Sequence, residues 1–150
     1  MSTSDRQELE QAAVRLLASR EHTRAELKRK LGSRADDPAL LEQVLNSLET
    51  QRLQSDGRFV EQYIDSRKRK GYGPLRIRQE LQQKGVGGEL IEQWLDERDS
   101  EWMDLLGEAA RRKYGSSPAS DYKEKARRAR FLEYRGFPTE LIREFLWADD

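Results

Sequence analysis

One apolar motif occurs three times along this chain of 150 residues. It reads ADDPALLEQVL at residues 35–45, GVGGELIEQWL at residues 85–95 and GFPTELIREFL at residues 136–146. The spacing defines a repeating unit of about 50 residues, a length typical of tandem repeat proteins. In such proteins each unit buries its apolar face against its neighbours, so a row of three similar units is expected.

Within each unit the apolar residues have helical spacing. Residues 41–48 follow the pattern i, i+3, i+4, i+7, and no sustained alternation of apolar and polar residues indicates a strand. We therefore predict an all-α fold: three tandem three-helix repeats of about 50 residues in an elongated, curved array. The predicted repeats cover residues 1–55, 56–99 and 100–150.

Capping residues and prolines indicate where the helices begin, and glycines indicate where they end. The start signals are Thr23 with Glu26, Asp56, Gly73 with Pro74, and Ser117 with Pro118, and the stop signals are Gly32, Gly85 and Gly136. The predicted helices cover residues 5–19, 23–32, 38–53, 56–70, 74–84, 87–98, 100–114, 119–135 and 138–148. The sixth and seventh are close enough to form one bent helix.

The composition predicts a thin core, because 37% of the residues are charged and only 35% are hydrophobic. The chain has no cysteine, which excludes disulfides and thiolate chemistry. It has neither an apolar run long enough for a membrane span nor the features of a signal peptide. We therefore expect a soluble, cytoplasmic monomer. Trp94 and Trp147 fall at apolar repeat positions and are predicted to lie in the core, whereas Trp102 fits either environment.

Nothing in the sequence points to catalysis. His22 is the only histidine and lies beside a helix start, so we expect a surface or turn residue. The acidic residues between 89 and 104 are evenly scattered, as on an exposed helix face, and Gly71–Gly73 is too short for a dinucleotide motif. We predict no catalytic, metal-binding or cofactor-binding residues, and hence no enzyme.

Basic residues recur at the same place in each unit, from the end of the first helix through the second, while the third helices are acidic. A chain with no net charge can thus carry a segregated cationic stripe. The stripe is either a set of solvated helix faces or a surface for an anion, meaning nucleic acid or an acidic protein face. Tyr72 fits either stacking on a base or covering the helix junction. The candidate partner-binding residues of the stripe are Arg24, Lys28, Arg67, Lys68, Arg69, Lys70, Tyr72, Arg76, Arg78, Lys84, Lys123, Lys125, Arg127, Arg128 and Arg130.

Several of these segments resemble the RecX family, bacterial regulatory proteins that modulate the recombinase RecA. The segments are REHTRAEL at residues 20–27, DGRF at 56–59, Arg67 with GYG at 71–73, RIRQELQQKG at 76–85 and YRGF at 134–137. The resemblance covers nearly the whole chain and is most specific over residues 53–96. The family often has Asn before the Asp of its central motif; this chain has Ser55 there, which leaves the expected cap at Asp56 in place.

The resemblance implies a protein of three three-helix repeats that associates with RecA filaments on single-stranded DNA. It further implies inhibition or modulation of RecA's recombinase, ATPase and co-protease activities, and hence a role in DNA repair, recombination and the SOS response. The residues themselves leave a second possibility open, namely direct binding of single- or double-stranded DNA by the basic helices. A steep salt dependence of binding to naked DNA would distinguish that function.

Overall fold

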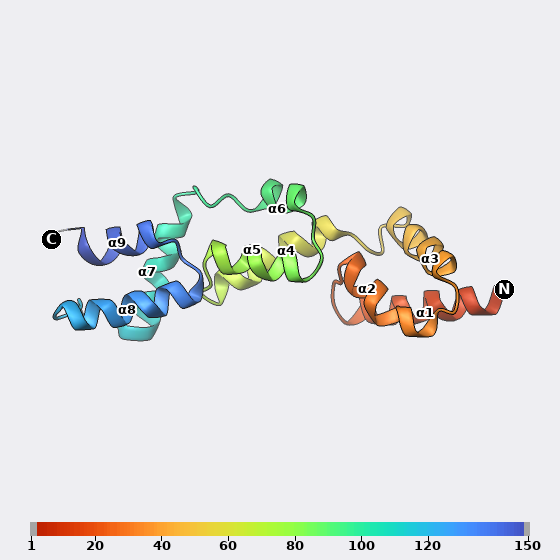
Figure 1. Cartoon of the computed structure of the whole chain (residues 1–150), viewed down its shortest axis with the longest axis horizontal. Coiled ribbons are helices and arrows are strands. Elements are labelled where there is room, and N and C mark those ends of the chain that lie inside the picture. Colours follow the sequence, from red (N-terminus) through yellow and green to blue (C-terminus); the bar gives the residue numbers. More distant parts are fainter. Residues whose placement is uncertain (1–2, 149–150) are drawn as a thin grey trace.

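A computed structural model of the chain describes residues 3–148, and every regular element in this part is a helix. The elements are α1 (Thr3–Ser19), α2 (Arg24–Leu31), the short 3-10 helix η1 (Gly32–Arg34), α3 (Pro38–Thr50), α4 (Asp56–Arg69), α5 (Pro74–Gln83), α6 (Gly88–Trp94), α7 (Glu101–Tyr114), α8 (Tyr122–Arg135) and α9 (Thr139–Trp147). Helices α1–α3, α4–α6 and α7–α9 form the first, second and third repeats. They follow one another along an elongated molecule, with α1 and α9 at opposite ends (Figure 1). The predicted all-α fold of three three-helix repeats is confirmed.

The local signals explain most helix boundaries. At the start of α2, the hydroxyl of Thr23 accepts a hydrogen bond from the Glu26 backbone N–H at 3.0 Å, and the Glu26 carboxylate accepts one from the Thr23 N–H at 3.0 Å. The predicted capping box is therefore present. Pro74 occupies the first turn of α5, where its missing N–H costs no hydrogen bond. Gly136 ends α8 with a φ of 100°, which a residue with a Cβ rarely adopts.

Two helix starts differ from the prediction. Ser55, and not Asp56, caps α4, since its hydroxyl accepts from the Arg58 N–H at 3.1 Å. Helix α8 begins at Tyr122, after the point indicated by Ser117 and Pro118, because the Asp121 carboxylate caps it. In both cases the residue directly before the first helical turn provides the acceptor, as capping geometry requires.

The sixth and seventh helices are separate, as their predicted ranges indicate, and the alternative of one bent helix is wrong. Leu95 is extended, with φ −122° and ψ 101°, and ends α6. The carboxylates of Asp96 and Asp99 then accept hydrogen bonds from the N–H groups of Arg98 and Glu101, each at 2.9 Å. Aspartates that bond the backbone two residues ahead favour turns over helix, which explains the break.

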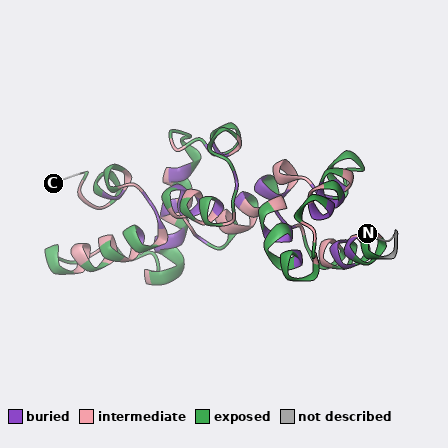
Figure 2. Ribbon diagram, turned by 45° about the vertical axis from the view of Figure 1, so that its right-hand side comes forward, coloured by how far each residue is buried: buried purple, intermediate pink, exposed green. Residues whose placement is uncertain are grey.

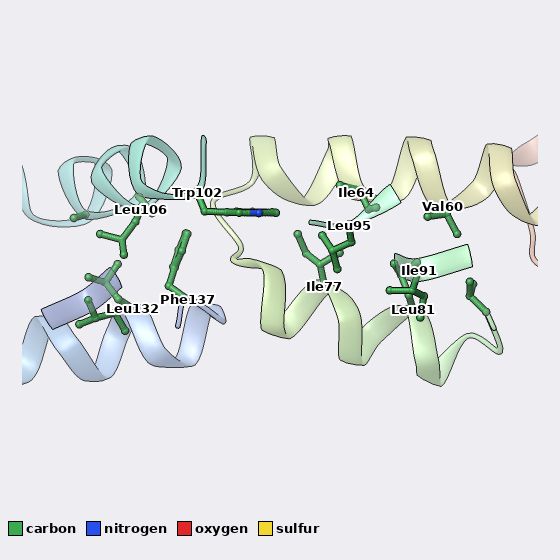
Figure 3. Packing of buried hydrophobic residues seen from close by; sticks show 14 of the residues in the cluster. Val60, Ile64, Ile77, Leu81, Ile91, Leu95, Trp102, Leu106, Leu132 and Phe137 are labelled. Carbon is green, nitrogen blue, oxygen red and sulfur yellow. The ribbon is translucent and has the colours of Figure 1, made fainter. Parts of the chain in front are cut away.

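The buried apolar residues form two clusters. One belongs to the first repeat alone, and the other runs through the second and third repeats. Trp102 lies in the middle of the second cluster, between Ile77 of the second repeat and Phe137 of the third (Figure 3), and only 1% of its surface is exposed. The helices expose their outer faces to solvent (Figure 2). The second and third repeats therefore share one core, to which the first repeat is attached.

The prediction that Trp94 lies in the core is wrong, because 40% of its surface is exposed. Its counterpart in the first repeat, Val44, is fully buried on a helix of 13 residues. Helix α6 has only seven residues and ends at Trp94, whereas Leu95, just beyond its end, is buried like its counterpart Leu45. Trp147 is also predicted to lie in the core, and it is half-buried against the shared core. Trp102, for which the sequence leaves both environments open, is fully enclosed by the core.

The first and second repeats meet through polar contacts. The Thr23 hydroxyl donates to the backbone carbonyl of Lys84 at 2.7 Å, and the Arg24 N–H donates to the Asp56 carboxylate at 2.9 Å. The ammonium of Lys84 lies 3.6 Å from the carboxylate of Glu26, which is buried. The start of α2 is thus fixed to the start of α4 and the end of α5 by hydrogen bonds rather than by a shared apolar core.

His22 lies in the turn beside this junction, but it is buried, with 1% of its surface exposed. Its Nε2 atom is 2.9 Å from the ammonium of Lys30, so it accepts, and its Nδ1–H donates to the carbonyl of Arg20 at 3.0 Å. Burial, together with the neighbouring charges of Arg20 and Lys30, lowers the pKa of His22. The expected turn position is confirmed, whereas the expected surface exposure is wrong.

An isolated fragment of residues 1–55 is expected to fold but to be less stable than the same segment in the full chain. It keeps its own core but loses the three polar contacts to the second repeat described above. Each contributes about 0.5–1.5 kcal/mol, or roughly 1.5–4.5 kcal/mol in total. Hydrogen exchange of the α2 amides in the fragment and in the full chain measures this difference. If the free energy of opening of α2 were the same in the fragment and in the full chain, the contacts to the second repeat would not stabilise the first.

Candidate partner-binding surface

Two basic residues of the second repeat share one carboxylate. Arg67 near the end of α4 approaches Glu80 of α5 to 2.8 Å, and Arg76, one turn before Glu80, approaches it to 3.2 Å. The hydroxyl of Tyr63 donates to the same carboxylate at 2.7 Å. Both guanidinium groups are mostly covered, so they hold α4 against α5 rather than extending freely into solvent.

This arrangement shifts two pKa values. Burial alone would raise the pKa of Glu80, but hydrogen bonds from Tyr63, Arg67 and Arg76 outweigh it and lower that pKa below its ordinary value. Burial and the bond to the Glu80 carboxylate raise the pKa of Tyr63 to about 12. Glu80 is therefore ionised and Tyr63 neutral at physiological pH, which is the state that binds both arginines.

Tyr72 covers the junction between the second and third repeats. The guanidinium carbons of three arginines lie near the centre of its ring, Arg67 at 3.8 Å, Arg76 at 4.5 Å and Arg135 at 4.6 Å. Such cation–π contacts leave little of the ring free to stack on a base. The geometry therefore favours the interpretation of Tyr72 as a cover of the helix junction.

Most of the other candidate basic residues in the first two repeats are paired with carboxylates, several of them on or next to the acidic third helices. Arg24 lies 2.6 Å from Glu42 of α3, and Arg78 lies 2.6 Å from Glu97, just after α6. Further ion pairs join Arg24 to Glu49, Lys28 to Glu42, Lys68 to Glu101, Arg69 to Asp65 and Lys84 to Glu26. Ion pairs thus interrupt the predicted cationic stripe in both repeats, because a basic helix lies beside an acidic one.

In the third repeat the predicted residues divide into two groups. Arg127 and Arg128 both pair with Glu124, and the guanidinium of Arg128 also lies 4.7 Å from the ring centre of Tyr114. Lys125 is half-buried, whereas Lys123 and Arg130 are exposed. Within residues 3–148 no carboxylate lies within ion-pair distance of Lys123 or Arg130. These two cations of α8 are available to a partner.

A further group of cations surrounds a small hollow where α4 meets α7 and α8. We call this group the junction cluster, and its members are Lys70, Arg112, Lys113 and Arg135. Only Lys70 was among the candidates chosen from the sequence. The signal for two of the others is the basic run at residues 111–113, which ends the first helix of the third repeat as residues 67–70 end that of the second.

Arg112 and Arg135 connect the third repeat to the end of α4. Arg112 donates to the carbonyl of Arg69 at 2.9 Å, and Arg135 donates to the carbonyl of Lys70 at 3.1 Å. The last carbonyls of a helix lack partners within the helix, so these bonds satisfy them. Sequence reasoning missed both contacts because the bonded residues are far apart in the chain.

Among the described residues, no group of three or more His, Cys, Asp or Glu side chains is placed to hold a metal ion. No helix in residues 3–148 is long and apolar enough to cross a membrane.

Comparison with known proteins identifies the family. Models of the first, second and third three-helix domains of RecX match residues 11–48, 55–95 and 99–146. The chain belongs to the RecX family. Two similar RecX relatives are each named regulatory protein RecX. The one from Pseudomonas savastanoi pv. phaseolicola is 43% identical over 134 residues, covering 89% of this chain and 86% of the relative. The one from Halorhodospira halophila is 40% identical over 139 residues, covering 93% and 86%.

Solved RecX structures show the same fold. The crystal structure of RecX from Lactobacillus salivarius superposes with a TM-score of 0.77 at 21% identity, covering 94% of each chain. A second crystal structure of a regulatory protein RecX gives a TM-score of 0.76 at 21% identity, covering 97% of this chain and 74% of the other. The resemblance to RecX drawn from the sequence is therefore confirmed, and the protein is a RecX-type regulatory protein.

Proposed function

We propose that the protein regulates the recombinase RecA by binding the filament that RecA forms on single-stranded DNA. Binding inhibits or modulates the recombinase, ATPase and co-protease activities of that filament. The observation that carries the proposal is the match of all three repeats to the RecX domains, together with relatives named regulatory protein RecX along most of the chain.

The shape of the molecule supports a filament as the partner. The three repeats form a long row with a core no more than a few helices wide (Figure 1). An elongated protein with cations at regular intervals is suited to lie along a groove of a helical polymer. In a compact protein of the same length, fewer of the cations would reach such a partner at once.

Among the candidate residues, we propose that the exposed ones without ion pairs contact the filament. Lys123 and Arg130 on α8 and Lys70 at the end of α4 meet this condition in the described part of the chain. The paired residues, such as Arg67, Arg76 and Arg78, hold neighbouring helices together. Reversing their charge would therefore disturb the fold along with any binding surface.

Charge reversal of Lys123 and Arg130 tests the proposal. The double variant Lys123→Glu with Arg130→Glu is expected to raise the concentration needed for half-inhibition of RecA's DNA-dependent ATPase by about tenfold, because charged contacts speed encounter and hold the docked state. The same change at Arg15 and Arg29, two exposed cations of the first repeat outside the candidate set, is the matched control. Thermal melts verify that both variants are folded.

Sedimentation with RecA filaments, formed on single-stranded DNA with and without nucleotide, provides the direct test of binding. The parent protein is expected to sediment with the filament and to lower its ATPase. If the parent neither sediments with filaments nor changes the ATPase at any concentration, the proposed function is wrong. If it does both and the Lys123 and Arg130 variant matches it, the partner surface lies elsewhere on the molecule.

A further inference from the structure

The junction cluster differs from the rest of the cationic stripe in having almost no carboxylates. Within residues 3–148, no carboxylate oxygen lies within 4.0 Å of the charged groups of Lys70, Lys113 or Arg135, and Arg112 has only Glu108 at 3.8 Å. The partners of Arg112 and Arg135 are backbone carbonyls, and the ammonium of Lys113 lies 5.7 Å from the centre of the Phe131 ring. The positive charge of this cluster is therefore not neutralised by its neighbours.

Two guanidinium groups of the cluster converge above Gly71. A Cβ atom at this glycine would lie 3.8 Å from Nη1 of Arg112 and 3.9 Å from Nη1 of Arg135. Each group gives one N–H to a carbonyl of α4, and a guanidinium has five N–H donors. Most donors of both arginines thus remain for a ligand, while the carbonyl bonds fix the direction in which they point.

The end of α4 supplies part of the missing negative charge but not all of it. A helix C-terminus corresponds to about half an elementary negative charge. The cluster brings four cations to that end, so a net positive charge remains. Repulsion among these cations disfavours the empty arrangement, and a bound anion would relieve it.

The size of the hollow limits the anion. Its volume is about 170 Å³, whereas pockets for drug-sized ligands measure about 300–1,000 Å³. Liquid water takes about 30 Å³ per molecule, so the hollow has room for a group of a few heavy atoms. A phosphate group fits within that volume.

We propose that the junction cluster binds a phosphate group of a single-stranded DNA backbone. Guanidinium forks match the geometry of phosphate oxygens, and the two lysines add point charges on either side. The proposal rests on the proposed function in taking the DNA of the filament as the source of the phosphate. Because α4 belongs to the second repeat and α7 and α8 to the third, the bound group also ties these two repeats together.

Removal of the two lysines is the sharpest test, because both are exposed and neither has a recorded carboxylate partner in the described chain. The variant Lys70→Gln with Lys113→Gln leaves Arg112 and Arg135 bonded to the carbonyls of α4. The matched control is Arg15→Gln with Arg29→Gln, which removes the same charge from the first repeat. Binding of a fluorescent oligothymidylate is measured by anisotropy across a range of salt concentrations, after melts show that all three proteins are folded.

The expected loss follows from counterion release. Each phosphate contact on a single strand contributes about 0.7 to the slope of log K against log salt. Loss of the one phosphate contact of the cluster therefore lowers the slope by about 0.7 and weakens binding at 0.1 M salt by about fivefold. The control is expected to bind like the parent. If the parent does not bind the oligonucleotide, or if variant and control lose the same affinity and slope, the proposal is overturned.

Two competitors distinguish the ligand from related anions. The first competitor is poly-glutamate. If it displaces the oligonucleotide from the parent at an equal concentration of charge, an acidic protein segment is the occupant and the proposal is overturned. Inorganic phosphate is the second competitor. If it stabilises the parent against heating while parent and variant bind DNA equally well, the cluster is a site for free phosphate and the proposal is overturned. Inhibition of RecA's ATPase by the parent is unaffected by these outcomes, so failure of this proposal is distinguishable from failure of the proposed function.

Discussion

Replacement of Gly136 by alanine is expected to destabilise the protein by roughly 2–5 kcal/mol. Gly136 has a φ of 100°, and a left-handed backbone costs a residue with a Cβ about 1–2 kcal/mol. The new Cβ would also lie 2.3 Å from Cβ and 2.6 Å from the backbone N of Arg76. Moving the two segments apart to relieve this steric overlap costs about 1–3 kcal/mol more.

The damage is expected to extend beyond the end of α8. The carbonyl of Gly136 accepts a hydrogen bond from the Leu75 N–H at 3.0 Å, and the carbonyl of Arg135 accepts one from the Gly73 N–H at 2.7 Å. A shift at Gly136 therefore breaks the backbone contacts between the second and third repeats. Urea unfolding of Gly136→Ala compared with the parent measures the loss.

Gly88→Ala is the matched control for this substitution. Gly88 lies in the first turn of α6, and a Cβ there would meet no atom within 4 Å. Alanine at that position is expected to be neutral or to stabilise the helix slightly. If both substitutions changed the urea midpoint equally, the close approach at Gly136 would not explain the stability of the junction.

The second large effect is expected from Glu80→Gln. An amide cannot replace the carboxylate that receives Arg67, Arg76 and Tyr63, because it has one acceptor oxygen and no charge. Breaking a fully buried ion pair costs about 3–5 kcal/mol, and we expect about 2–4 kcal/mol here because the group is partly exposed. Chemical unfolding at neutral pH measures this difference.

The same substitution carries a pH signature. Since the folded protein lowers the pKa of Glu80 from its ordinary value of 4.5, its ionised carboxylate contributes stability that is complete above that value. The contribution is lost as the pH falls through the lowered pKa, because the protonated parent then resembles the amide. The stability difference between parent and Glu80→Gln is therefore expected to shrink in acid. Glu133→Gln, at an exposed carboxylate of α8, is the matched control. A stability difference between parent and Glu80→Gln that stays constant with pH would contradict the assigned role.

The repeat architecture could be predicted because its signals are local. The capping box at Thr23, the proline at the start of α5 and the glycines that end α5 and α8 act on residues within one helical turn. The apolar motif then shows that each set of three helices is a variation of the same unit. Helix boundaries and the repeat can therefore be predicted from neighbouring residues alone, without knowing which distant residues are in contact.

The candidate site was harder to predict because its properties depend on distant contacts. Basic runs indicate where cations occur but not which carboxylates face them, so Arg24 and Arg78 appeared free although both are paired. Arg112 and Arg135 gain their position from carbonyls 43 and 65 residues away along the chain.

The division of the core into two clusters has a mechanical consequence. Helices α1 and α9 lie at opposite ends of the molecule (Figure 1), so a pull on both ends loads the cores and the junctions in series. The junction between the first and second repeats consists of a few hydrogen bonds and ion pairs, whereas Trp102 and its neighbours join the second to the third across a continuous apolar core. Under tension the weakest link in a series yields first. The protein would therefore lengthen in a discrete step, with the first repeat swinging away as a folded unit while the other two stay together.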